Sequence, residues 1–129
     1  MSKNYDNTIP IFMAPKPLRK KVMRIVTDSK TVEEPKDPNT CHVFKLFSLF
    51  ASAEQIANLK AAYLKGGMGY GHAKEALFQL LQETFEPKRE RYDAYMADTG
   101  KLDRILLEGA DVARQKAIQT LKRVKKHIL

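Results

Sequence analysis

The chain has 129 residues, and 43% of them are hydrophobic, which is enough for one domain with a modest core. Its 23 lysines and arginines outnumber 15 acidic residues, and the net charge of +8 favours an anionic partner such as RNA, DNA or acidic lipid. The single cysteine excludes an internal disulfide, and no apolar run is long enough to cross a bilayer. We therefore expect a cytoplasmic protein with no membrane segment.

The amino-terminal third alternates loops with a short helix. Residues 1–14 hold turn-forming side chains without helical periodicity, so we expect a loop there. Pro15 and Pro17 suit the first turn of a helix, whose apolar face is Leu18, Val22, Ile25 and Val26. Two more prolines, Pro35 and Pro38, indicate that residues 27–38 form a connecting loop.

A second helix is expected after this loop, capped by Asp37, Asn39 or Thr40. Its wide apolar face should enter the core and consists of Val43, Phe44, Phe47 and Phe50. The cysteine just before it, Cys41, has apolar neighbours, which indicates a small buried thiol rather than a reactive one.

A third helix begins at Ser52, which forms a capping box with Gln55. It should end at Gly66-Gly67, where a left-handed residue can close the last turn. Its apolar face is Ile56, Leu59, Tyr63 and Leu64.

The remainder of the chain is also predicted to be helical. A stripe over residues 73–96 includes Ala73, Leu77, Leu80, Leu81, Thr84 and Phe85, extended by Tyr92, Tyr95 and Met96. Pro87 should kink or split this helix, Thr99 should cap another one through Leu107, and Gly109 should bend the chain before the last helix. The last helix has a narrow stripe of Ala113, Ala117, Leu121, Val124 and Ile128. No strand is evident, so the predicted fold is all-α, a bundle of about five to six helices.

Few residues point to catalysis. The histidines, His42, His72 and His127, are too widely spaced for a zinc site, so no metal is predicted. No serine lies in a G-x-S-x-G elbow, which argues against hydrolase chemistry. The glycine cluster at residues 66–71 matches no nucleotide-binding pattern, and the KH-type G-x-x-G interpretation lacks the required strands. A tight turn between two helices is the simpler interpretation, although Lys65 and Lys74 beside it keep an RNA-backbone contact possible.

Two helices are strongly basic, and their charge has two interpretations. The first carries Lys16, Arg19, Lys20, Lys21 and Arg24 without an acidic residue, and the last carries Arg114, Lys116, Lys122, Arg123, Lys125 and Lys126 against Asp111 alone. Such runs are either solvated faces or contacts for a polyanion. The small alanines of the last stripe argue against binding to a membrane surface.

Several separate stretches of the chain carry one family signal. They include residues 1–10, M-S-K-N-Y-D-N-T-I-P, the stretch Val26-Thr27-Asp28-Ser29, and residues 67–71 with Lys74. Residues 1–10 resemble the lysine-rich signature loop K-M-S-K-S of class I aminoacyl-tRNA synthetases, as it occurs in the tryptophanyl-tRNA synthetase family. The second stretch follows at the interval expected of that family, and the third is similar to its glycine-tyrosine-glycine turn. Glu90-Arg91-Tyr92 and Glu108-Gly109-Ala110 continue a resemblance that covers nearly the whole chain.

The resemblance implies a role in ATP-dependent attachment of tryptophan to tRNA, with ATP and Mg²⁺ used by the parent enzyme. Lys3 would stabilise charge on pyrophosphate as the catalytic cation, and Met1, Ser2 and Lys3 would form the ATP-binding part of a mobile loop. Two departures stand out, because the first signature lysine would precede Met1 and Asn4 replaces the usual serine. The H-x-G-H signature and the Rossmann-type half are absent from these residues, so the chain alone should be inactive and bind no ATP.

The same resemblance implies an organisation and a set of partners. It assigns 1–14 to the signature loop left from a Rossmann-type catalytic domain, 15–97 to a helical anticodon-binding domain, and 98–129 to helices that pack on the missing catalytic domain. Tryptophan-specific tRNA would be bound through Lys65, Lys74, Lys88, Arg89 and Arg91, and the parent enzyme would be a homodimer. Without its partner, the chain should have low stability and some self-association. The alternatives are a free-standing helical RNA-binding module and a helical interaction protein.

Overall fold

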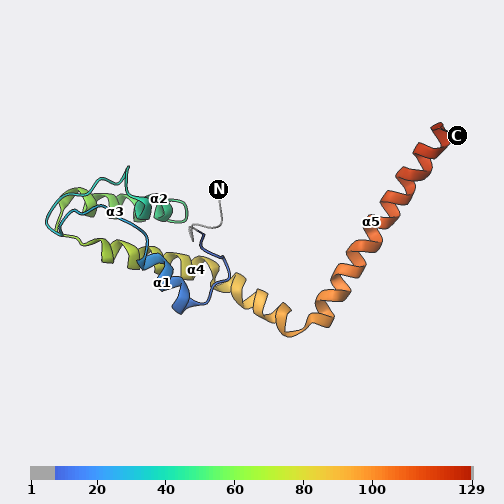
Figure 1. Ribbon diagram of the computed structural model, residues 1–129, viewed down its shortest axis with the longest axis horizontal. Helices are drawn as coiled ribbons and strands as arrows, with labels where there is room; N and C mark the ends of the chain where they lie inside the picture. The colour runs from blue at the N-terminus through green and yellow to red at the C-terminus, as the bar shows by residue number, and fades with distance from the viewer. Residues whose placement is uncertain (1–7, 129) are drawn as a thin grey trace. The chain divides into compact units, whose positions relative to one another are not determined.

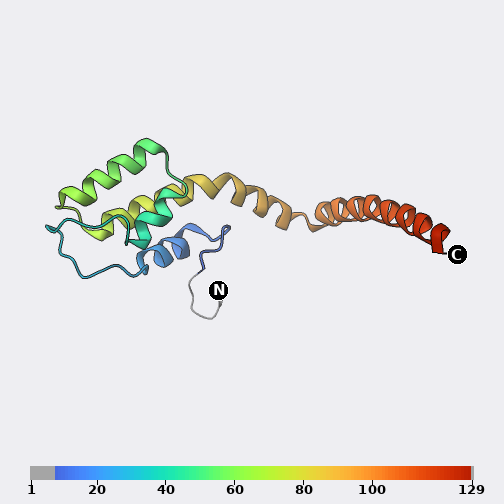
Figure 2. The ribbon, with the colours of Figure 1, turned by 90° about the horizontal axis from the view of Figure 1, so that it is seen from above.

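The computed structural model describes residues 8–128 and contains five α-helices, with no strand among these residues (Figure 1). The predicted all-α class is therefore confirmed, and the number of helices falls at the lower end of the expected range. The chain divides into two compact units, one reaching Arg89 and the other beginning at Glu90. The boundary lies inside the fourth helix. In both views of the first unit, the amino-terminal half of that helix lies between α1 (Pro15–Met23) and α3 (Ala53–Lys65) (Figure 2).

The first helix, α1 (Pro15–Met23), starts with proline in its first turn, as expected, and buries Leu18 and Val22. It ends earlier than the apolar pattern predicted, and Val26 lies beyond its end as an exposed side chain. The apolar period continues through Ile25 and Val26, but the Ile25 amide donates to the Val22 carbonyl three residues earlier, at 3.1 Å, in the tighter turn that ends the helix.

The second helix, α2 (His42–Ser48), buries Val43, Phe44 and Phe47 against the core. The predicted side-chain caps are wrong, because its N-cap is Cys41, whose side chain makes no capping bond. Asp37 instead accepts hydrogen bonds from the Asn39 amide at 2.8 Å and the Thr40 hydroxyl at 3.2 Å, so it closes the turn before the helix. Phe50 was expected in the core, but it lies past the end of α2 and is exposed.

The third helix, α3 (Ala53–Lys65), has the predicted capping box in full. The Gln55 amide donates to Ser52 Oγ at 3.2 Å, and the Ser52 amide donates to Gln55 Oε1 at 2.8 Å. Tyr63 is its one buried residue, whereas Leu64 is 55% exposed and does not belong to the apolar face. The sequence pattern placed both Tyr63 and Leu64 on the apolar face of α3. The observed burial shows that only the Tyr63 side chain points into the core.

The fourth helix, α4 (Tyr70–Ala97), provides the largest share of the core, with Ala73, Leu77, Phe78, Leu80 and Leu81 buried. It is not split at Pro87, which lies inside the helix, so that part of the prediction is wrong. Proline has no backbone N–H, so the carbonyl of Glu83, four residues before Pro87, lacks its helical hydrogen-bond donor. Both residues are exposed, so water can satisfy this carbonyl.

The second unit holds the end of α4 and the fifth helix, α5 (Thr99–Ile128). The predicted break at Gly109 is wrong, because α5 continues through it; one internal glycine costs only about 1 kcal/mol relative to alanine. Asp98 rather than Thr99 caps the start of α5, because its carboxylate accepts a hydrogen bond from the Lys101 amide at 3.0 Å. Within this unit, Tyr92, Tyr95 and Met96 are exposed, and none of the residues of α5 is buried.

An aromatic cluster forms the centre of the first unit. Tyr63 is fully buried and meets the Phe44 ring edge-on at a centroid distance of 5.3 Å and the Tyr70 ring at 6.1 Å. Its hydroxyl lies 3.4 Å from the sulfur of Cys41. The buried free thiol predicted for Cys41 is therefore confirmed, and burial together with this contact raises the pKa of Tyr63.

Candidate functional site

The described part of the predicted signature loop, residues 8–14, is held against the helices of the first unit. Lys21 Nζ of α1 donates a hydrogen bond to the Thr8 carbonyl at 2.6 Å, and Arg89 Nη1 of α4 donates to the Met13 carbonyl at 3.0 Å. Arg89 is only 9% exposed, so its guanidinium makes a partly buried structural contact and is not a surface charge. Residues 8–13 are therefore fixed at both ends by basic side chains.

The residues predicted to bind ATP, namely Met1, Ser2 and Lys3, lie outside the described residues. Their roles stay predictions.

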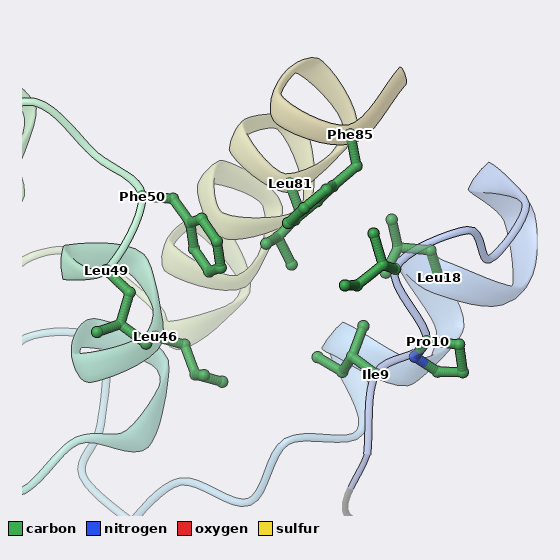
Figure 3. Close-up of a pocket in the computed structure, with 9 residues that line it drawn as sticks. Ile9, Pro10, Leu18, Leu46, Leu49, Phe50, Leu81 and Phe85 are labelled. Atoms are coloured by element: carbon green, nitrogen blue, oxygen red, sulfur yellow. The ribbon is translucent and has the colours of Figure 1, made fainter. Parts of the chain in front are cut away.

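An apolar groove of about 410 Å³ lies beside this anchored segment, and all of its lining residues belong to the first unit (Figure 3). Ile9, Pro10 and Leu18 face Leu46, Leu49 and Phe50 across it, with Leu81 and Phe85 of α4 completing the wall. The groove contains no titratable or nucleophilic side chain, so it can hold an apolar group but cannot perform catalysis.

The glycine cluster forms a tight turn between α3 and α4, in agreement with the simpler interpretation. Gly66 has φ of +75° and Gly67 φ of +79°, a region that residues with a side chain rarely adopt. A Cβ atom on Gly66 would also collide with the Glu33 carbonyl oxygen. The Gly67 amide donates to the Val32 carbonyl at 2.9 Å, so it is already engaged within the protein. The turn packs on the connecting loop and does not present its amide to a phosphate.

Lys36 stabilises the connecting loop from within. The residue is 2% exposed, and its ammonium donates to the carbonyls of Thr31 at 2.8 Å, Val32 at 3.3 Å and Glu34 at 3.0 Å. The same group lies 5.2 Å from the centroid of the Tyr70 ring. A loop without regular secondary structure must satisfy its carbonyls in another way, and this lysine satisfies three of them.

A small polar pocket of about 270 Å³ lies where the connecting loop meets the start of α4. The Tyr70 hydroxyl donates to Asp28 Oδ1 at 2.7 Å across 42 residues of sequence, and the Lys30 amide donates to the same oxygen at 3.2 Å. The hydrogen bond from Tyr70 lowers the pKa of Asp28 below its ordinary value of 3.8, so the carboxylate is charged at neutral pH. Burial, followed by the contact with Asp28, raises the pKa of the Tyr70 hydroxyl.

Sequence reasoning assigned no role to Asp28, Tyr70 or Lys36. Asp28 lies in the V-T-D-S stretch and Tyr70 in the glycine-tyrosine-glycine turn, so two of the family-like stretches meet at this pocket. The resemblance of both stretches to one family could have indicated that Asp28 and Tyr70 matter, but only the fold shows that they contact each other.

The predicted RNA-binding residues have different environments. Lys65, Lys88 and Arg91 are exposed. Lys74 is partly buried and donates to the Met23 carbonyl at 3.2 Å, and Arg89 is engaged with the anchored segment. For Lys74 and Arg89, an RNA contact would compete with bonds that hold the first unit together.

The histidines do not form a metal site in the part of the chain that the structure describes, where no group of three or more potential ligands occurs. His42 and His72 are exposed and belong to different helices, and His127 is exposed near the end of α5. Between residues 8 and 128, no helix is long and apolar enough to cross a membrane.

Sequence relatives and solved structures similar to this chain carry the same enzyme name. No protein-family model matches the chain. The tryptophan–tRNA ligase of Rhodopirellula baltica is 41% identical over 127 residues, which cover 98% of this chain and 40% of that protein. The ligase of Pseudomonas aeruginosa is 49% identical over 115 residues, covering 89% of this chain and 25% of that protein.

Among solved structures, the crystal structure of a tryptophanyl-tRNA synthetase from Campylobacter jejuni, complexed with ADP and tryptophan, is similar with a TM-score of 0.92. The two sequences are 40% identical, and the match covers 99% of this chain and 40% of that chain. The aligned residues form the carboxy-terminal part of the relatives. This chain thus spans between a quarter and about two fifths of the length of the relatives it matches.

Proposed function

We propose that this chain is the carboxy-terminal part of a tryptophan–tRNA ligase, the enzyme that uses ATP to attach tryptophan to its tRNA. The observation that carries the proposal is the extent of the similarity, which reaches 98% of this chain at 41% identity. Neither alternative, a free-standing RNA-binding module or a helical interaction protein, accounts for a match that continues through both units at this level.

In this proposal, residues 15–97 bind the anticodon region of the tryptophan-specific tRNA. The exposed cations Lys65 and Lys88 of the first unit and Arg91 of the second are the favoured phosphate contacts, because no carbonyl among the described residues accepts a hydrogen bond from them. Lys74 and Arg89 contribute mainly by holding α4 against α1 and the anchored segment. The net charge of +8 supports this role by attracting RNA over a longer range.

The signature loop supplies the ATP-contacting residues of the parent enzyme. Met1 and Ser2 would place the loop on the nucleotide, and Lys3 would stabilise negative charge as pyrophosphate leaves. Mg²⁺ would accompany ATP, because this ion is usually bound through substrate phosphates and few protein ligands. The hydrogen bonds from Lys21 and Arg89 to residues 8–13 would define where the loop emerges.

Helix α5 would pack on the catalytic part of the parent enzyme, which we propose to be a cytoplasmic homodimer. The predicted stripe supports this, because Leu121, Val124 and Ile128 are all exposed. The functional division proposed here, 1–14, 15–97 and 98–129, differs from the division into compact units at residue 89 because α4 extends across the latter boundary.

The first experiment measures binding of tryptophan-specific tRNA and a non-cognate tRNA to the chain across a salt series. We expect a cognate preference at every salt concentration and a steep fall in affinity with salt. Replacing Lys65, Lys88 and Arg91 with alanine should reduce the logarithmic salt slope by about one per phosphate contact. The matched control replaces Lys116, Lys122 and Lys125 on α5. Equal binding of both tRNAs would contradict the anticodon assignment.

A second experiment tests the enzymatic part of the proposal. A chimera would join the amino-terminal part of the Rhodopirellula baltica ligase to this chain, and charging of tRNA with tryptophan would be measured. We expect activity in the chimera, none in this chain alone, and a loss of about a hundredfold or more on Lys3→Ala. Lys16→Ala serves as the control. A folded but inactive chimera would count against the proposal.

A further inference from the structure

The apolar groove of the first unit has large hydrophobic side chains that are open to solvent. Ile11 is 54% exposed, Leu49 73% and Phe50 39%, and all three line the groove. The Phe50 ring meets the Phe85 ring edge-on at a centroid distance of 5.5 Å, so part of the wall is aromatic (Figure 3). Exposed apolar side chains that gather in one place are characteristic of an interaction site, whereas singly scattered ones are not.

The walls of the groove are already ordered. Residues 9–11 form one wall, and the basic side chains of Lys21 and Arg89 hold the chain on either side of them. Leu18 and Leu81 also line the groove and belong to the buried core. A surface with this degree of order loses little conformational entropy when a partner binds, so a modest apolar contact can be stable there.

The chemistry of the lining indicates an apolar protein segment as the occupant. Every described residue that lines the groove is isoleucine, leucine, phenylalanine or proline. An RNA backbone requires cations for binding, and this lining has none. A polar small molecule requires hydrogen-bonding groups that fix its orientation, and the lining side chains provide none of these either.

The course of the polypeptide in the relatives indicates which segment this is. The matched residues form the carboxy-terminal part of the relatives, and most of the Rhodopirellula baltica ligase precedes them. Ile9, in the groove wall, is eight residues from residue 1, and eight residues span at most about 28 Å. A segment tethered so closely has an effective concentration on the order of millimolar, which favours it over any untethered partner.

We propose that this groove is a docking surface for the part of the parent enzyme that precedes this chain, and that apolar side chains of that part fill it. The inference rests on the proposed function, which supplies the preceding part. The groove is a contact separate from the one proposed for α5, and it lies in the first unit. Because residues 9–11 form a groove wall and continue the signature loop, docking here holds the catalytic part next to that loop.

The test uses thiol labelling, because the single cysteine of the chain, Cys41, is buried. Leu49→Cys places a thiol in the groove, and Leu64→Cys places one at another exposed position of the first unit, outside the groove. Each variant is labelled with a maleimide in the full chain and in the chimera with the Rhodopirellula baltica amino-terminal part. Mass spectrometry of the labelled peptides then gives the rate at each position.

We expect both thiols to react at similar rates in the chain alone. In the chimera, labelling of Leu49→Cys should slow by about tenfold or more, which corresponds to a docking equilibrium constant of about ten or more. Labelling of Leu64→Cys should change by less than about twofold, because nothing covers that position.

A reporter on the opposite wall tests whether the groove itself causes the protection. In the chimera, Ile11→Cys should also be labelled slowly. Adding Leu49→Asp puts a carboxylate where docking would bury it without a partner, so labelling at position 11 should become about fivefold faster or more. Adding Leu64→Asp is the matched control and should leave position 11 protected. Both aspartates replace exposed leucines, and circular dichroism confirms that each variant is folded.

The possible failures are distinguishable. If Leu49→Cys is labelled equally fast in the chain alone and in a chimera that charges tRNA, the docking surface is overturned and the proposed function stands. Protection that appears in the chain alone and increases with its concentration also overturns the inference, because a second copy would then fill the groove. If the chimera is folded but inactive and position 49 is unprotected, the docking surface and the proposed function are both overturned.

Discussion

The two units of this chain have similar shares of hydrophobic residues but very different degrees of burial. The first unit has a continuous core, in which Val22, Val43, Tyr63, Ala73 and Leu77 are completely buried. In the second unit, Leu102 is the only described residue that is even partly buried, although α5 carries many large apolar side chains. An apolar stripe on a helix therefore does not by itself show that the helix has a partner within the same chain.

The difference also concerns how polar groups are satisfied. In the first unit, an irregular loop is stabilised by a buried lysine, and a turn depends on two glycines with positive φ. In α5, the backbone N–H and C=O groups pair with one another within the helix, so they require no tertiary contact. Mutations should consequently be costly in the first unit and nearly neutral in the second, and the following pairs of variants test this contrast.

The largest difference should come from two leucines. Leu77 is fully buried and Leu121 is 53% exposed. We expect Leu77→Ala to lower the free energy of unfolding by about 2–5 kcal/mol, through lost apolar burial and the cavity left behind. Leu121→Ala should change it by less than about 0.5 kcal/mol. Urea denaturation followed by tyrosine fluorescence measures both. Equal losses would mean that α5 is packed in solution.

A second pair compares lysines. Lys36→Met would remove the ammonium that donates to three carbonyls, and we expect a loss of about 2–3 kcal/mol, because buried hydrogen bonds to charged groups are strong. The Thr31 and Glu34 carbonyls would lose this donor, whereas the Val32 carbonyl would keep the Gly67 amide. Lys116→Met on α5 replaces an exposed lysine and should be neutral. The same urea denaturation applies. A neutral Lys36→Met would show that the loop does not depend on this residue.

A third pair compares glycines. Gly66→Ala introduces a Cβ that collides with Glu33 and forces alanine into a positive φ, so we expect a destabilisation of about 1–3 kcal/mol. Gly109→Ala should have the opposite sign, because it raises helix propensity inside α5 by about 1 kcal/mol. Helix content by circular dichroism and thermal midpoints measure the two effects. Stabilisation by Gly66→Ala would contradict the turn geometry.

The smallest effect concerns pH. The pKa of Asp28 is lowered in the folded state, chiefly by the hydrogen bond from Tyr70. Its contribution to stability is therefore present above its ordinary pKa of 3.8 and is lost as the pH falls through that value towards the lower folded pKa. Thermal midpoints at pH 5 and pH 3 should fall less in Asp28→Asn than in the unaltered chain. Asp111→Asn, on α5, should leave the fall unchanged.

Sequence patterns predicted the structure correctly where it depends on residues close together in the sequence. The capping box at Ser52 and Gln55 depends on residues three positions apart, so the start of α3 could be predicted closely. The same holds for the glycine turn after Lys65 and for the buried Cys41. Two of the wrong predictions have the same cause. Pro87 and Gly109 were expected to interrupt helices, but the structure shows that a long helix tolerates a single unfavourable residue.

The sequence by itself determined the helical class, the basic character and the resemblance of separate stretches to the tryptophanyl-tRNA synthetases. These properties reside in single residues or in neighbours a few positions apart. Only the tertiary structure decided that Asp28 meets Tyr70, that Arg89 holds Met13, and that Lys36 is buried beneath a loop. Each of these contacts joins residues whose geometry is set by packing of the core, and no local pattern encodes which distant partner will satisfy a buried polar group.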